Sequence, residues 1–171
     1  MKSFSKILAA FIIVFAFSQK AFSHCEIPCG IYHDELRIEM LKEHITTIEK
    51  SMKQIEELQK ADDINYNQLV RWIDNKELHA NKMQEIVYQY FMNQRIKPVD
   101  PSEGEKYDTY IEQITLAHEL LVYSMKAKQS TDLEVISMLT EKLDAFDAAY
   151  FKDKDHRHKM GEDKEKEEHK H

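Results

Sequence analysis

The sequence contains 171 residues, with 24 basic and 31 acidic side chains and a formal net charge of −7. An acidic chain lacks the basic face that phosphate binding requires, so nucleic acid is excluded as an expected partner. Three glycines and three prolines are few for a fold rich in sheets and turns, and one domain is expected at this length.

Residues 1–23 have the pattern of a secretory signal peptide. Lys2 and Lys6 precede an apolar run from Ile7 to Phe17. The segment Ala21-Phe22-Ser23 then supplies small residues before an expected cut ahead of His24. The run is too short to span a bilayer. We therefore expect an exported protein, periplasmic or extracellular, with no membrane attachment after the leader is removed. An uncleaved amphipathic anchor is the alternative.

The two cysteines of the chain, Cys25 and Cys29, follow this expected cut directly. Cleavage before His24 would place an amine, an imidazole, the Cys25 amide and the Cys25 thiolate within a few bonds. Pro28 and Gly30 permit a tight turn that returns the Cys29 thiolate to the same ion. Amine, deprotonated amide and two thiolates form a square-planar set, which favours Ni(II) or Cu(II) over tetrahedral zinc. These anionic donors would also stabilise Ni(III), with the imidazole as an axial ligand.

Two other uses of the thiols are open. A disulfide between Cys25 and Cys29 is the usual state of cysteines in exported proteins, but it would close a very small loop and stabilise the fold little. A thiol-redox motif would be expected as Cys-x-x-Cys at a helix start in an α/β fold, and neither condition holds here.

Four segments repeat apolar residues in steps of three and four, at about 34–60, 67–94, 102–128 and 132–151. This repeat predicts an all-α, antiparallel four-helix bundle over residues 34–152. Residues 102–105 and 131–134 have the pattern of capping boxes at two helix starts. The inward residues expected in the third segment are Tyr107, Ile111, Ile114, Leu121 and Met125.

The environment of Lys76 and the structure of residues 153–171 are two further points on which the charged residues bear. Lys76 lies in the inward stripe of the second segment, where it either extends to the edge of the bundle or is a buried partner for an acid near residues 24–33. Residues 153–171 are almost entirely charged residues and histidine, which predicts a disordered tail. Weak nickel binding by the tail histidines is the alternative.

The motif His24-Cys25-x-x-Pro28-Cys29-Gly30-x-Tyr32 resembles the nickel hook of the nickel-containing superoxide dismutases. Arg37-Ile38-Glu39 resembles the segment that follows that hook, and Tyr90-Phe91 is a weaker similarity. The resemblance implies a four-helix-bundle homohexamer that converts superoxide to oxygen and hydrogen peroxide. It also implies that the hook, here residues 24–33, is disordered until it binds nickel.

The resemblance also implies roles for individual residues. His24, Cys25 and Cys29 would be the nickel ligands, with His24 and Tyr32 taking part in catalysis and Tyr32 orienting superoxide beside the open axial face. Glu39 would hold the axial imidazole.

The sequence departs from the family pattern in several places. The spacing from Tyr32 to Arg37 is one residue shorter, a proline after the tyrosine is missing, and the leader is of the secretory type. The arginine that supports the outer acid falls near Asn75, so Lys76 is the predicted substitute.

Three functions therefore compete: a nickel superoxide dismutase, an exported nickel- or copper-binding protein without catalysis, and a structural bundle with a disulfide at its tip. Tyr32 favours the enzyme, because a storage site has no need to gate a small substrate. Tyr32 as a packing residue only is the alternative to that role.

Overall fold

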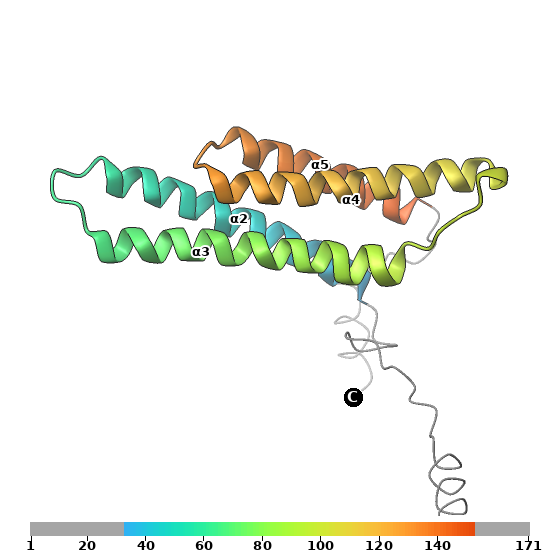
Figure 1. The fold of residues 1–171 in the computed structure, drawn as a ribbon, viewed down its shortest axis with the longest axis horizontal. Coiled ribbons are helices and arrows are strands. Elements are labelled where there is room, and N and C mark those ends of the chain that lie inside the picture. Colours follow the sequence, from blue (N-terminus) through green and yellow to red (C-terminus); the bar gives the residue numbers. More distant parts are fainter. Residues whose placement is uncertain (1–32, 153–171) are drawn as a thin grey trace, which may run out of the picture. The chain divides into compact units, whose positions relative to one another are not determined.

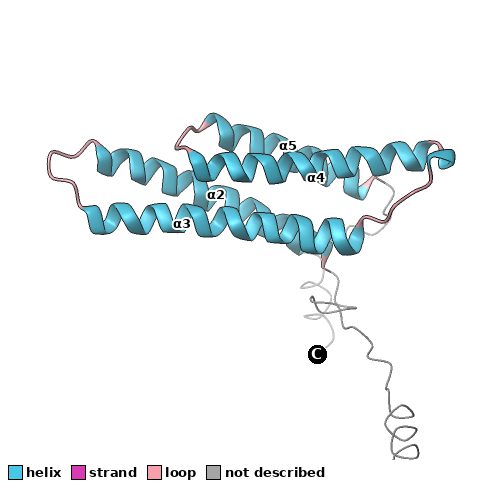
Figure 2. Ribbon diagram, viewed as in Figure 1, coloured by secondary structure: helices cyan, strands magenta, loops and turns pink. Residues whose placement is uncertain are grey.

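The computed structural model describes residues 33–152, and the predicted leader, nickel ligands and tail lie outside this part of the chain. Four long helices make up most of it (Figures 1 and 2). Their bounds are α2 Asp34–Gln59, α3 Tyr66–Glu85, α4 Glu105–Gln129 and α5 Glu134–Phe151. A π-helix, η1 (Ile86–Arg95), continues α3, and a 3-10 turn, η2 (Pro101–Glu103), precedes α4.

Consecutive helices run antiparallel, as predicted for a four-helix bundle. Helix α2 packs against α3 and α5, and α4 packs against the same two helices, so the four close into a ring around one core. The α2–α3 pair and the α4–α5 pair are offset along the bundle (Figure 1). No helix in residues 33–152 is long and apolar enough to cross a membrane.

The apolar repeats predicted in the first and fourth segments, which form α2 and α5, are confirmed as inward stripes. The buried side chains of α2 include Leu41, Ile45, Ile48, Met52 and Ile55, and those of α5 include Ile136, Leu139, Leu143, Phe146 and Tyr150. These spacings place each set on one side of an α-helix, where burial of the apolar surface drives packing.

The predicted inward face of α4 is wrong. Ile111 and Met125 are exposed, and the other three predicted residues are only half-buried. The buried residues are Ala117, Leu120, Ser124 and Ala127. Apolar residues lie on more than one side of this helix, so periodicity alone does not select the inward face. Three of these four buried residues are small, which allows α4 to approach its neighbours closely, while the bulky Ile111 and Met125 lie on the exposed side.

The second predicted helix changes type before its end. Tyr90 and Arg95 are five residues apart, and an α-helix would direct their side chains roughly 140° apart, given 3.6 residues per turn. The π-helical turns of η1 carry i→i+5 hydrogen bonds, as between the Ile96 N–H and the Phe91 carbonyl at 2.8 Å. This geometry places residues five apart on the same side.

The two predicted capping boxes are also wrong. Helix α4 begins after Gly104, which has a positive φ of 58°, and Asp100 accepts hydrogen bonds from the Ser102 N–H and hydroxyl. At α5 the side chain of Asp132, rather than that of Thr131, accepts from the Glu134 N–H at 2.9 Å. In both cases an aspartate two residues ahead of the donor satisfies an otherwise unpaired helix-terminal N–H.

Candidate functional site

The predicted metal ligands, His24, Cys25 and Cys29, and the predicted gate residue, Tyr32, lie outside the described residues. The described part of the chain contains no group of three or more His, Cys, Asp or Glu residues that could hold a metal ion. The first helical residue that the structure describes is Asp34, directly after the predicted hook in the sequence.

Asp34 is the first residue of α2, and its carboxylate is buried between three helices. Tyr90 Oη donates to Asp34 Oδ1 at 2.6 Å, and Tyr150 Oη donates to Oδ2 at 2.8 Å. The Arg95 guanidinium donates to both carboxylate oxygens, from Nε at 2.9 Å and from Nη2 at 2.7 Å. We call these four residues the Asp34 cluster.

The charges of the Asp34 cluster stabilise one another. Burial alone would raise the pKa of Asp34, but the hydrogen bonds from Arg95, Tyr90 and Tyr150 outweigh this effect and hold the pKa well below its usual range. Burial and the adjacent carboxylate raise the pKa values of both tyrosines. The cluster therefore contains one carboxylate, one guanidinium and two neutral phenols at neutral pH.

Aromatic rings pack around the buried carboxylate of the Asp34 cluster. Phe91 makes edge-to-face contacts with Tyr90, Phe146 and Tyr150, with ring centroids 5.0–5.2 Å apart. The Arg37 guanidinium lies over the Tyr90 ring, 5.0 Å from its centroid. The low polarity of these surroundings strengthens the ionic hydrogen bonds of Asp34.

Sequence reasoning missed three members of this cluster as functional residues: Asp34, Arg95 and Tyr150. One signal was present, because Asp34 continues the inward stripe of α2 through Ile38 and Leu41. A charged residue in an apolar stripe indicates a buried polar partner. No local pattern indicated Arg95, since its direction depends on the π-helical turns.

Glu39 lies on the exposed side of α2, with its side chain 55% exposed, and it accepts a hydrogen bond from Lys42 Nζ at 2.9 Å. In the described part of the chain, no contact joins Glu39 to Lys76. Asn75, next to Lys76, donates to Ser51 Oγ at 3.0 Å. Ser51 lies twelve residues beyond Glu39, which is about 18 Å of helix.

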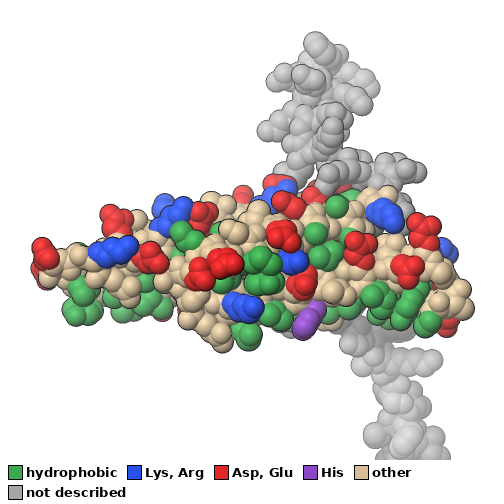
Figure 3. Space-filling model, turned by 90° about the horizontal axis from the view of Figure 1, so that it is seen from above, with side chains coloured by type: hydrophobic (Ala, Val, Ile, Leu, Met, Phe, Trp, Pro, Cys, Tyr) green, Lys and Arg blue, Asp and Glu red, His purple; other side chains and the backbone are tan. Residues whose placement is uncertain are grey.

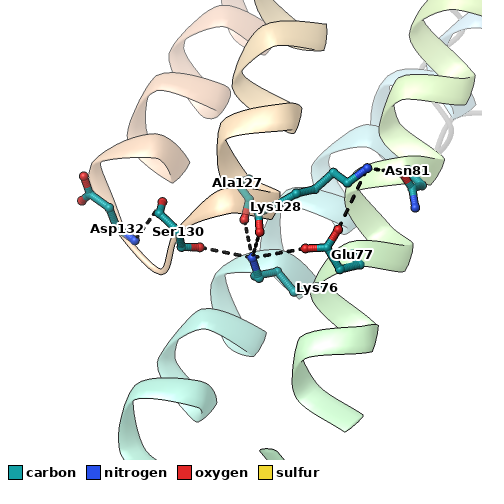
Figure 4. A network of polar contacts seen from close by, with 7 residues as sticks. All are labelled: Lys76, Glu77, Asn81, Ala127, Lys128, Ser130 and Asp132. Atoms are coloured by element: carbon teal, nitrogen blue, oxygen red, sulfur yellow. Dashed lines mark hydrogen bonds and ion pairs between the residues drawn. The ribbon is translucent and has the colours of Figure 1, made fainter. Parts of the chain in front are cut away.

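Lys76 is buried, with 4% of its surface exposed, so it does not extend to the edge of the bundle. Its Nζ donates to the carbonyls of Ala127 at 2.7 Å, Lys128 at 2.6 Å and Ser130 at 3.2 Å, at the C-terminus of α4 (Figure 4). Glu77 lies 3.5 Å from the same Nζ. A cation at a helix C-terminus is favoured by the helix dipole and satisfies its last carbonyls.

The contacts of Lys76 do not support its predicted role beside Glu39. The lysine joins α3 to the end of α4 and to the α4–α5 turn. Burial lowers the pKa of Lys76, and the charge of Glu77 opposes that change.

An all-α bundle whose first helix follows a segment with an imidazole and two thiols defines a class of metal-dependent helical proteins. Comparison with known protein families matches residues 19–154 to the nickel-containing superoxide dismutases. The chain therefore belongs to the nickel-containing superoxide dismutase family. No curated protein and no solved structure gave a match.

Family membership confirms the predicted class of activity and cofactor. The chain is an oxidoreductase that uses nickel to convert superoxide. The donor types at the predicted N-terminus fit nickel, because thiolate sulfur, imidazole and amine nitrogen suit this ion better than they suit Mg²⁺ or Ca²⁺.

Proposed function

We propose that the mature enzyme begins at His24 and holds nickel through three residues of the hook. The donors are the His24 amine and imidazole, the Cys25 amide and thiolate, and the Cys29 thiolate. The observation that carries this proposal is that both cysteines of a chain in this family lie within six residues of the predicted cut. Nickel bound by such donors supplies one-electron chemistry between Ni(II) and Ni(III).

The described structure supports a fixed base for the hook. Asp34 is two residues beyond Tyr32, and its carboxylate is held by Tyr90 and Arg95 of η1 and by Tyr150 of α5. A fixed Asp34 keeps the Tyr32 Cα within about 7 Å of the Asp34 Cα. We assign Tyr32 to orienting superoxide and to screening the site from water.

Glu39 is proposed to hold the His24 imidazole through a hydrogen bond, which would fix the ring orientation of a weakly bound ligand. Its exposed carboxylate supports this role, because Lys42 is a surface partner that it can exchange at little cost. Comparing Glu39→Gln with wild type by turnover per bound nickel tests the role, and unchanged turnover would contradict it.

Export and assembly complete the proposal. The leader predicts a periplasmic or extracellular enzyme, and the family resemblance implies a homohexamer. Recovery of the protein in the cytoplasmic fraction with residues 1–23 still attached would contradict export.

The central experiment measures the mature N-terminal mass and the bound metal of the full chain expressed with its leader. Cleavage before His24 and one nickel per chain are expected. A variant with one extra alanine before His24 should lose most nickel and activity, since the amine moves out of the chelate ring. The same alanine inserted in the tail, between Lys159 and Met160, is the control.

Full activity in the variant with the extra N-terminal alanine would overturn the N-terminal site. Full nickel content without turnover in the wild-type protein would support the metal-binding alternative instead.

A further inference from the structure

Two histidines face each other across the contact between α2 and α3, in a region to which neither the motif nor the family resemblance assigns a role. His44 Nδ1 and His79 Nδ1 are 3.0 Å apart. The ring centroids lie 4.9 Å apart and the planes are inclined at 77°. Both side chains are half-buried, so packing restricts the rings while water still reaches them. We call these residues the histidine pair.

The surroundings keep the histidine pair neutral. Burial lowers the pKa of His44 to about 4, and the positive charges of His79 and Lys82 act in the same direction. Burial and Lys82 also lower the pKa of His79. Neutral imidazole is the form that binds metal ions, so protons compete little for the two rings at neutral pH.

The spacing of the two nitrogens suits adjacent positions around one metal ion. Metal–imidazole bonds of about 2.0–2.1 Å place two ligands at right angles roughly 2.9 Å apart. We propose that the histidine pair is a second metal site, which takes a divalent first-row ion that favours imidazole and right-angled ligand positions, such as copper or nickel. Water would fill the remaining positions from the exposed side of the rings.

The charge and ligand count around the pair predict weaker binding than at the hook. Within residues 33–152 no third His, Cys, Asp or Glu joins the two rings in a metal-binding group. Lys82 adds a positive charge nearby, and no described contact brings a carboxylate to the pair. Nitrogen donors without carboxylates also exclude Mg²⁺ and Ca²⁺ as the expected ions.

Trp72, the single tryptophan of the chain, provides a local probe. It lies on α3 seven residues before His79, on the same side of the helix and about 10.5 Å along it. It also lines a groove between α2 and α3 with Thr47 and Asn75, so it lies along the same contact. A paramagnetic ion at the histidine pair should therefore quench its fluorescence.

The test titrates Cu(II) into the mature full-length protein with nickel already bound at the hook. Nickel content is measured before and after the titration, so that loss from the hook is detected. We expect saturable quenching of Trp72, with the apparent affinity at least tenfold weaker in His44→Gln and in His79→Gln. His118→Gln, a change at an exposed histidine of α4, is the matched control and should titrate as wild type.

Either of two results would overturn the second site. One is an absence of saturable quenching, and the other is the same quenching curve in His44→Gln, His79→Gln and wild type. Both would show that the pair is an N–H···N hydrogen bond between neutral rings. Far-ultraviolet circular dichroism of each variant verifies that the helices are intact.

Discussion

Asp34 joins the start of α2 to two later parts of the chain. Its partners Tyr90, Arg95 and Tyr150 lie 56, 61 and 116 residues away in sequence. A buried carboxylate is stable only when its lone pairs are satisfied, and here a guanidinium and two phenols satisfy them. The cluster thereby fixes the N-terminal end of α2, directly after the predicted hook in the sequence.

We predict that Asp34→Asn lowers both stability and activity. The amide retains the shape but removes the charge and places donors opposite donors, so the free energy of unfolding should fall by about 1–3 kcal/mol. Urea unfolding of the nickel-free protein measures this change. Glu43→Gln, at an exposed position of α2, is the control and should unfold as wild type. An unchanged midpoint in Asp34→Asn would show that the cluster does not stabilise the fold.

Lys76 shows how a charged residue in an apolar stripe can be structural. Its ammonium group replaces water at three carbonyls that end α4 (Figure 4). The contact with Ser130 also joins α3 to the α4–α5 turn. Among the described contacts, Lys76 is the only charged residue of α3 that reaches this turn.

We predict that Lys76→Met destabilises the bundle but does not change turnover per bound nickel. The methionine leaves the carbonyls of α4 without their cation, at a cost of about 1–3 kcal/mol. Urea unfolding and nickel-normalised activity separate the two effects, and Lys106→Met, at an exposed lysine of α4, is the control. A loss of turnover with unchanged stability would restore the role beside Glu39.

At the scale of whole elements, the contact between α2 and α3 contains the histidine pair. Lys82 on α3 is the cation that acts on both rings. Protonation of both rings would place two positive charges about 3 Å apart, beside a third charge. The lowered pKa values mean that the unfolded chain binds these protons more readily than the folded chain.

We therefore predict that stability falls as the pH falls from about 6.5, the ordinary pKa, towards the pKa of about 4 for folded His44. Above this window both states are unprotonated at these sites, and the pair has no effect on the slope. Urea midpoints of metal-free protein at pH 7.5 and 5.0 measure the change. The double variant His44→Gln with His79→Gln should show a smaller drop, and an equal drop would assign it to other groups.

The change from α3 to η1 is the second feature at this scale. π-Helical turns are rare and are frequently found at functional sites. Here the π-helical turns bring Tyr90 and Arg95 to the same carboxylate, although they lie five residues apart. The π-helical turns of η1 therefore determine the hydrogen bonds that hold Asp34 at the start of α2.

At the scale of the molecule, the offset of the two helix pairs leaves the start of α3 beside α2 but beyond the reach of α4 and α5 (Figure 1). Apolar side chains lie on the surface at this end (Figure 3), and Tyr66, Val70 and Ile73 are the exposed apolar residues of the first turns of α3. Exposed apolar groups of this kind occur at interfaces between subunits.

We predict that Val70→Glu prevents assembly and leaves the helical content unchanged. A carboxylate in an apolar subunit contact would be desolvated without a partner. Sedimentation velocity measures the mass of the assembly, and Thr115→Glu, at an exposed position of α4, is the control. Equal masses for Val70→Glu and wild type would show that this apolar surface is not a subunit contact.

The sequence by itself determined the helical class, the antiparallel bundle and the family. Helical periodicity depends on residues three and four positions apart. The predicted nickel donors of His24, Cys25 and Cys29 lie within six consecutive residues of the sequence. Both signals are local, so they can be read without knowing which surfaces meet.

Only the tertiary structure decided the Asp34 cluster, the partners of Lys76 and the inward face of α4. Each depends on residues far apart in sequence or on the π-helical turns of η1. Apolar residues on several sides of α4 left its orientation open until neighbouring helices selected the face with Ala117 and Ala127. The physical reason is that packing selects among faces that are nearly equivalent in one isolated helix.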